Sequence, residues 1–186
     1  MKITLLSITL LSALITPAFS QTKFGVKGGL NVSNIGGDAQ GNDPKLGFHV
    51  GAFVNIKSSD KFAIQPELVF SRQGAQSSEN SKLKVNYDYI NLPVMFHFYA
   101  SQNVFFMTGP QLGILTAAKI KYEDQSASIK DALNSMDFGL GFGLGVNSDD
   151  VTFSARYTLG LSNTSKSDEG TFPNRVFQLS IGFKFQ

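Results

Sequence analysis

Residues 137–147 read Asp-Phe-Gly-Leu-Gly-Phe-Gly-Leu-Gly-Val-Asn. Every second residue in this stretch is large and apolar, and glycine fills most of the positions between. Because side chains alternate between the two faces of a β-strand, the pattern predicts a strand with one apolar face and one nearly bare face. A phosphate-binding loop is also rich in glycine, but its glycines surround a tight turn before a helix. The strict spacing of two therefore favours a strand over a ligand loop.

The same alternation recurs seven more times along the chain. The expected strands are 23–33, 46–57, 62–73, 85–99, 104–118, 137–147, 151–163 and 175–185. Six apolar residues fall on the opposite phase from the rest: Phe53, Val69, Met95, Phe105, Met107 and Leu115. The pattern predicts an all-β protein with one apolar face on each strand.

The connections between these strands alternate between long and short. The short ones, 58–61, 100–103 and 148–150, consist largely of Ser, Asp and Asn, which suit tight turns. An even strand number with short turns at one end and long loops at the other is typical of bacterial outer-membrane barrels. A strand of about 11 residues tilted by about 40° spans about 28 Å, enough for an apolar band of about 25 Å. We therefore predict an eight-stranded antiparallel transmembrane β-barrel with short periplasmic turns and long extracellular loops.

The alternation alone does not say which face points outward. A soluble eight-stranded barrel of the lipocalin type would place the apolar face inside. Glycine on the polar face favours the membrane barrel, because small residues make room in a narrow lumen whereas they weaken a strand that faces water. On this interpretation Phe142→Arg is expected to harm assembly far more than Gly143→Ser, because a small hydroxyl would find polar partners in the lumen.

Composition excludes several other classes. The chain has 186 residues, of which 42% are hydrophobic and 16% charged, a length suited to one domain and a charge content below the roughly 25% of soluble proteins. It has no Cys, which excludes disulfides, thiolate metal centres and a lipid anchor on Cys. Its 16 Lys and Arg nearly balance 14 Asp and Glu, so no nucleic-acid partner is expected.

The first twenty residues resemble an export signal. Lys2 precedes an apolar run over 3–15, and Ala18 and Ser20 provide the small residues that a cleavage site before Gln21 needs. The alternative is a buried N-terminal helix. No later stretch is an unbroken apolar run of the roughly 20 residues that a membrane helix requires. We predict a signal peptide at 1–20, a barrel domain at 21–186 and location in the outer membrane of a Gram-negative cell, with membrane lipid and the barrel-insertion machinery as partners.

Five short motifs in order resemble the PorT-like outer-membrane β-barrel family of the Bacteroidota. They are residues 25–31 (GVKGGLN), 65–74 (QPELVFSRQG), 89–94 (YINLPV), 108–113 (TGPQLG) and 157–161 (YTLGL).

The resemblance spans the whole predicted barrel and implies a fold and a location. Most members of that family have no assigned activity, and the member that gives the family its name is linked to protein secretion. Such barrels often end on an aromatic residue that the insertion machinery reads. This chain departs from that pattern, because Phe185 is penultimate and Gln186 is last.

The best-defined polar groups are charges on the lumen face. Lys27, Glu67 and Arg156 are expected near the midpoints of their strands, and Asn91 and Gln111 share the polar face, giving a predicted lumen polar network. A charge in a narrow lumen is costly unless it is paired, so we expect Glu67 within about 4 Å of Arg156 or Lys27. The cluster could brace the barrel or gate a polar path.

No catalytic, cofactor-binding or metal site is expected. His49 and His97 share the phase of the polar face, so neither matches a Ser–His pair that acts on lipid, and two His without Cys make a poor transition-metal site. Acidic pairs at 123–124 and 168–169 could bind calcium but lack the EF-hand pattern.

The sequence favours a non-enzymatic outer-membrane barrel with a structural role or a role in surface interaction through its extracellular loops, with an unidentified extracellular or periplasmic protein partner. A porin-like small-solute channel or a secretion accessory is the alternative. A lipid-modifying enzyme and a soluble ligand-binding barrel are less favoured.

Overall fold

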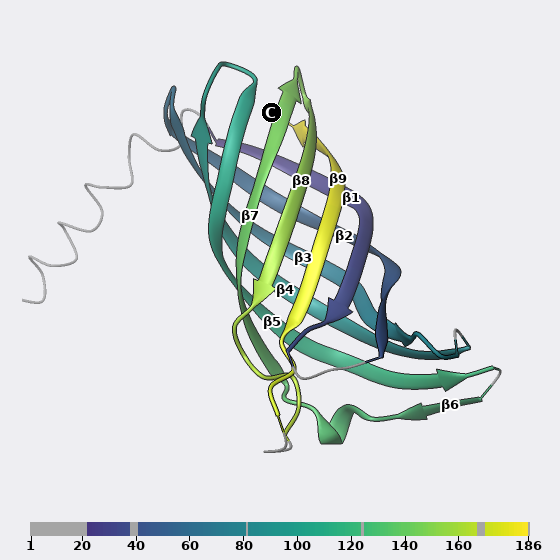
Figure 1. The fold of residues 1–186 in the computed structure, drawn as a ribbon. Coiled ribbons are helices and arrows are strands. Elements are labelled where there is room, and N and C mark those ends of the chain that lie inside the picture. Colours follow the sequence, from purple (N-terminus) through teal and green to yellow (C-terminus); the bar gives the residue numbers. More distant parts are fainter. Residues whose placement is uncertain (1–21, 38–40, 81, 124, 167–169, 186) are drawn as a thin grey trace, which may run out of the picture.

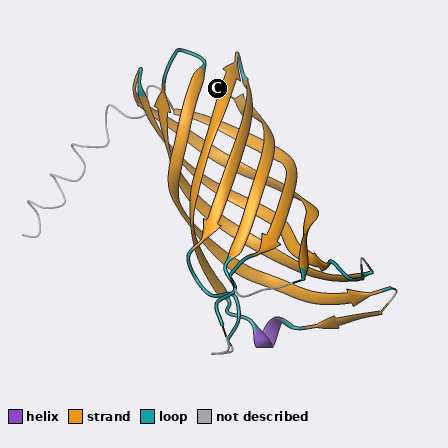
Figure 2. Cartoon of the chain, in the orientation of Figure 1, coloured by secondary structure: helices purple, strands orange, loops and turns teal. Residues whose placement is uncertain are grey.

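Eight long strands close into one antiparallel ring in the protein's structure, a computed structural model (Figures 1 and 2). The structure describes residues 22–37, 41–80, 82–123, 125–166 and 170–185. The ring strands are β1 Thr22–Ile35, β2 Asn42–Ser59, β3 Phe62–Ser77, β4 Leu83–Tyr99, β5 Val104–Tyr122, β7 Met136–Ser148, β8 Val151–Gly160 and β9 Asn174–Phe185. Consecutive ring strands pair with each other, and β9 pairs with β1 to close the ring. The predicted eight-stranded barrel is confirmed.

Short and long connections lie at opposite ends of the ring, as predicted. We call these the short-turn end, which also carries the C-terminus, and the long-loop end (Figure 1). The predicted loop at 119–136 is wrong in detail, because it contains strand β6, Gln125–Ser128, and a 3-10 turn at Lys130–Ala132. Among the described strands, β6 pairs with β5 alone. The predicted signal peptide at 1–20 lies outside the described residues.

The described residues contain no helix that is long and apolar enough to cross a membrane.

The apolar face of every strand points outward. Phe24 is 60% exposed, Leu144 53% and Leu179 52%, and large apolar side chains from all eight ring strands share this exposure. A soluble barrel would bury this face, because so much apolar surface in water is strongly unfavourable. The soluble alternative is therefore excluded, and the exposed band matches a lipid-facing surface.

The six apolar residues on the opposite phase all point into the lumen. Phe53, Val69, Met95, Phe105, Met107 and Leu115 are each at most 5% exposed. Met95, Phe105 and Met107 pack together near the short-turn end, and Leu115 joins a second apolar cluster near the long-loop end. The lumen is thus filled by side chains, as expected for eight strands.

Strands β2 to β5 run further toward the long-loop end than the alternation predicts. Strand β2 begins at Asn42 rather than at residue 46, β3 ends at Ser77 rather than at 73, and β5 ends at Tyr122 rather than at 118. Strand β8 ends earlier, at Gly160 instead of 163. Beyond the apolar band the outer face of a strand meets water rather than lipid, so backbone pairing continues without the apolar alternation that marks it in the sequence.

Glycine in the lumen does more than make room. A Cβ atom on Gly143 would lie 2.3 Å from the carbonyl oxygen of Ala155 on β8, so the adjacent backbone itself occupies the space. The premise that a small side chain has room at Gly143 is therefore wrong, and a serine there would require the backbone to shift. A Cβ on Gly141 would instead meet the terminal methyl group of Met95, at 3.2 Å, and Cδ of Arg156, at 3.5 Å, which is ordinary contact distance.

We expect the barrel to show heat-modifiable migration in gels. A closed ring has no free edge from which to unzip, so it should stay compact in dodecyl sulfate until it is boiled. The measurement compares boiled and unboiled samples of protein refolded in detergent. Equal migration of the two samples would contradict the closed ring.

Candidate functional site

Three charged side chains meet in the middle of the lumen. Glu67 of β3 accepts hydrogen bonds from Arg156 of β8, with Nη2 2.6 Å from Oε1 and Nη1 3.0 Å from Oε2, and from Lys27 Nζ of β1 at 3.0 Å. Gln65 Nε2 donates to Glu67 Oε1 at 2.9 Å. The three ionic side chains are 0–6% exposed, and their strands are not neighbours in the ring, so they link opposite walls across the interior. We call Lys27, Glu67 and Arg156 the ion cluster.

The other two residues of the predicted lumen network lie apart from this cluster. Asn91 is buried on β4, beside Val69 and Gly113. Gln111 is half-buried on β5, opposite Pro93. No hydrogen bond among the described residues joins either amide to the ion cluster. The alternation in the sequence predicted that both side chains face the lumen, but it could not predict that they lie apart from the cluster.

A second polar layer, missed by the sequence reasoning, lies nearer the long-loop end. Asn31 Oδ1 accepts from His49 Nδ1 at 2.8 Å and from Gln178 Nε2 at 3.1 Å, and Asn31 Nδ2 donates to Ser71 Oγ at 2.9 Å. The Oδ1 atom receives donors, so His49 carries its proton on Nδ1 and accepts on Nε2 from the Ser180 hydroxyl, 2.8 Å away. This layer ties β1, β2, β3 and β9 together.

The order Ser180, His49, Asn31 matches the nucleophile, base and orienting group of a hydrolase. Its surroundings do not match. His49 is 2% exposed, and Ser180 borders a lumen cavity of only about 20 Å³, which admits a water-sized particle and no lipid ester. We assign the three residues a bracing role.

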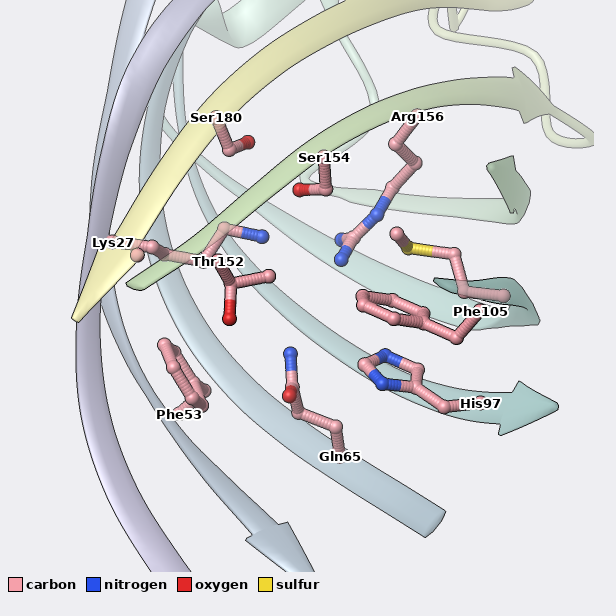
Figure 3. Close-up of a pocket in the computed structure, with 11 residues that line it drawn as sticks. Lys27, Phe53, Gln65, His97, Phe105, Thr152, Ser154, Arg156 and Ser180 are labelled. Carbon is pink, nitrogen blue, oxygen red and sulfur yellow. The ribbon is translucent and has the colours of Figure 1, made fainter. Parts of the chain in front are cut away.

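His97 is a buried histidine whose ring nitrogens lack hydrogen-bond partners among the described residues. It is 2% exposed, and its ring stacks on Phe105 with centroids 4.4 Å apart. His97 borders the same 20 Å³ cavity, into which side chains point from several strands (Figure 3). The sequence placed His97 on the lumen face near the short-turn end but gave no signal for this cavity.

A larger polar cavity opens at the short-turn end. It has a volume of about 440 Å³ and is lined by Lys23, Lys57, Lys184, Asn55 and Tyr99, among others. Lys57 Nζ lies 5.8 Å from the centre of the Tyr99 ring, and Lys184 Nζ donates to Asn147 Oδ1 at 2.5 Å. We call this cavity the basic vestibule.

The part of the chain that the structure describes contains no group of three or more His, Cys, Asp or Glu side chains close enough to hold a metal ion. The acidic pairs considered for calcium include Asp124, Asp168 and Glu169, which lie outside the described residues.

Comparison with known proteins agrees with this architecture. Ail, the attachment invasion locus protein of Yersinia pestis, is 18% identical, with a TM-score of 0.55 over 88% of this chain and 98% of that one. Neisserial surface protein A is 13% identical, with a TM-score of 0.59 over 87% of this chain and 95% of that one. At these identities the likeness shows the fold alone. No curated protein sequence matches the chain significantly.

The family comparison sets the location and orientation. In outer-membrane barrels the short turns face the periplasm and the long loops face the exterior. The basic vestibule therefore opens to the periplasm, and β6 lies on the extracellular side. Residues 19–166 match the family model described as outer membrane protein beta-barrel domain, and the chain belongs to that family of outer-membrane proteins.

Proposed function

We propose that this protein is a non-enzymatic outer-membrane barrel that presents a preformed extracellular surface to a partner. The observation that carries the proposal is the unequal length of the strands. Strands β2 to β5 have 16 to 19 residues, whereas β7, β8 and β9 have 10 to 13. One side of the barrel therefore continues as a sheet beyond the apolar band, with β6 added at its margin (Figure 1).

A core of its own stabilises this sheet extension. Tyr87, Tyr89, Leu115, Ala118 and Leu133 form a buried cluster beneath it. An isolated β-bridge also joins Leu133 and Ser165, which lie in two different loops. A surface supported in this way loses little conformational entropy when it binds, which supports a role in recognition.

The outer edge of β6 offers a mode of binding. All four residues of Gln125–Ser128 are exposed, and in the described structure the strand pairs only with β5. Edge strands with unpaired N–H and C=O groups accept added strands from other chains. We infer that a protein partner docks here by extending the sheet.

The filled lumen favours this role over that of a small-solute channel. The ion cluster crosses the middle of the lumen, and the cavity beside it holds only about 20 Å³. An open diffusion path would require the cluster to separate, and breaking a buried ion pair is costly.

Two finer assignments belong to the same proposal. The five motifs quoted above support membership of the PorT-like subfamily, for which a secretion-accessory role is the second candidate. The order of charge, apolar run and cleavage site supports residues 1–20 as a signal peptide. Mass spectrometry of the mature protein would test the second assignment, since cleavage leaves Gln21 at the N-terminus.

Photo-crosslinking in intact cells tests the proposed surface. A photoreactive amino acid at Ala127 on β6 should yield a discrete adduct, because this residue lies on the proposed docking edge. The matched control is Gln102 in an exposed periplasmic turn. Adducts at Gln102 and none at Ala127 would contradict extracellular docking and favour a periplasmic secretion partner. Unitary conductance in planar bilayers would instead support a channel.

A further inference from the structure

The cavity beside the ion cluster has an unusual lining. Both cations of the cluster, Lys27 and Arg156, border it, but neither Glu67 nor any other carboxylate of the described residues does. Figure 3 shows the Lys27 ammonium pointing into the space that Gln65 and His97 face from the opposite side. The cavity thus meets the positive side of the cluster.

The charges of the cluster do not cancel. Among the described residues, the fully buried ionic side chains are Lys27, Arg156 and Glu67, which leave one positive charge in excess. A buried charge loses its solvation by water, so a buried cation without a counter-charge is strongly unfavourable. A bound anion would neutralise it.

Hydrogen-bond donors are available around the cavity. Arg156 uses Nη1 and Nη2 on Glu67, and its buried Nε has no hydrogen-bond partner in the described part of the chain. Lys27 donates to Glu67 through one of its three N–H groups. His97, also without partners, can donate from one ring nitrogen. Buried donors without acceptors are rare in proteins and call for an explanation.

The size and the walls of the cavity select the kind of anion. A volume of about 20 Å³ admits a single particle close to the size of a water molecule. Phe53, Phe105 and Met107 form apolar walls, which suit a weakly hydrated monovalent ion better than a phosphate or sulfate.

The basic vestibule provides a route to this cavity from the periplasm. Lys23, Lys57 and Lys184 line the vestibule with one carboxylate, Asp149. The lining therefore carries an excess of positive charge, and such a cleft raises the local concentration of anions. Asn55, in the vestibule wall, donates to Gln65 Oε1 at 3.0 Å, and Gln65 borders the inner cavity. The Asn55–Gln65 hydrogen bond thus joins a side chain of the vestibule wall to one that lines the inner cavity.

We propose that the lumen cavity is a binding site for one halide ion, chloride in the natural setting, that enters from the periplasm and completes the charge balance of the ion cluster. The ion is held by Lys27 Nζ and Arg156 Nε, with His97 as the third donor.

Urea unfolding of the refolded barrel tests this proposal. A ligand that binds only the folded state raises the folding equilibrium constant by the factor 1 + [L]/Kd. The constant should therefore rise with sodium chloride, approaching tenfold for each tenfold increase in chloride above Kd. It should stay flat in sodium gluconate of the same ionic strength. Coincident chloride and gluconate curves would overturn the proposal and leave water in the cavity.

A pair of variants locates the effect. Lys27→Met removes the excess charge and leaves the Arg156–Glu67 pair, so it should abolish the chloride dependence, whereas Lys27→Arg keeps the charge and should retain it. A chloride response that survives in Lys27→Met would place the ion elsewhere and overturn the proposal. If these variants do not fold, crystals of the wild-type protein grown in sodium bromide still decide: an anomalous peak in the cavity is expected, and its absence contradicts the site.

Discussion

Glu67→Gln is expected to lower the stability of the folded barrel by about 3–5 kcal/mol, the usual effect of removing one partner from a buried ion pair. Glu67 is the shared acceptor of Lys27 and Arg156, and its side chain is fully buried. A neutral amide of nearly the same shape leaves two buried cations without a counter-charge. The urea midpoint of the refolded protein should fall, with little change in the slope of the transition.

A double variant separates charge from shape. Glu67→Gln with Arg156→Gln leaves only Lys27 charged, so part of the lost stability should return relative to Glu67→Gln alone. Additive losses in the double variant would show that the three charges do not act as a unit. Bilayer conductance of Glu67→Gln is the second measurement, because stepwise currents in this variant alone would assign the cluster a gating role.

The alternation of residues predicted the parts of the fold in which the two faces of a strand meet different solvents. It placed Lys27, Glu67 and Arg156 at one depth, and their side chains meet there in the structure. Alternation lost its predictive value above the apolar band, because the outer face of the sheet there meets water rather than lipid, although Ala75 in the extension of β3 to Ser77 is still buried. The extension and β6 were therefore missed.

Apart from the ion cluster, lumen contacts between distant strands were also beyond the sequence. His49 and Ser180 are 131 residues apart in the sequence, yet they form a hydrogen bond. Their strands, β2 and β9, are separated in the ring by β1 alone. Strand phase gives the direction of each side chain but not the stagger of the ring, which decides which residues share a level. The same limit explains Asn91 and Gln111, which have the predicted phase but do not join the ion cluster.

Phe142→Arg is expected to impair barrel assembly strongly. Phe142 lies at the middle of β7, is 46% exposed and points outward into the apolar band. An arginine at the bilayer midplane of a barrel costs about 2–4 kcal/mol, which falls toward zero near the interfaces. The yield of heat-modifiable protein after folding into liposomes should drop well below that of the wild-type protein.

The matched controls lie on the same strand. Phe142→Leu keeps an apolar side chain toward the lipid and should fold nearly as well as the wild-type protein. Gly141→Ala changes the adjacent residue on the lumen face, where the nearest atom is the terminal methyl group of Met95, at 3.2 Å, so a small movement of that flexible side chain makes room. Gly143 is unsuitable for this purpose because backbone blocks its Cβ. Equal folding yields for Phe142→Arg and Phe142→Leu would mean that this face does not meet lipid, since water solvates an arginine at no such cost.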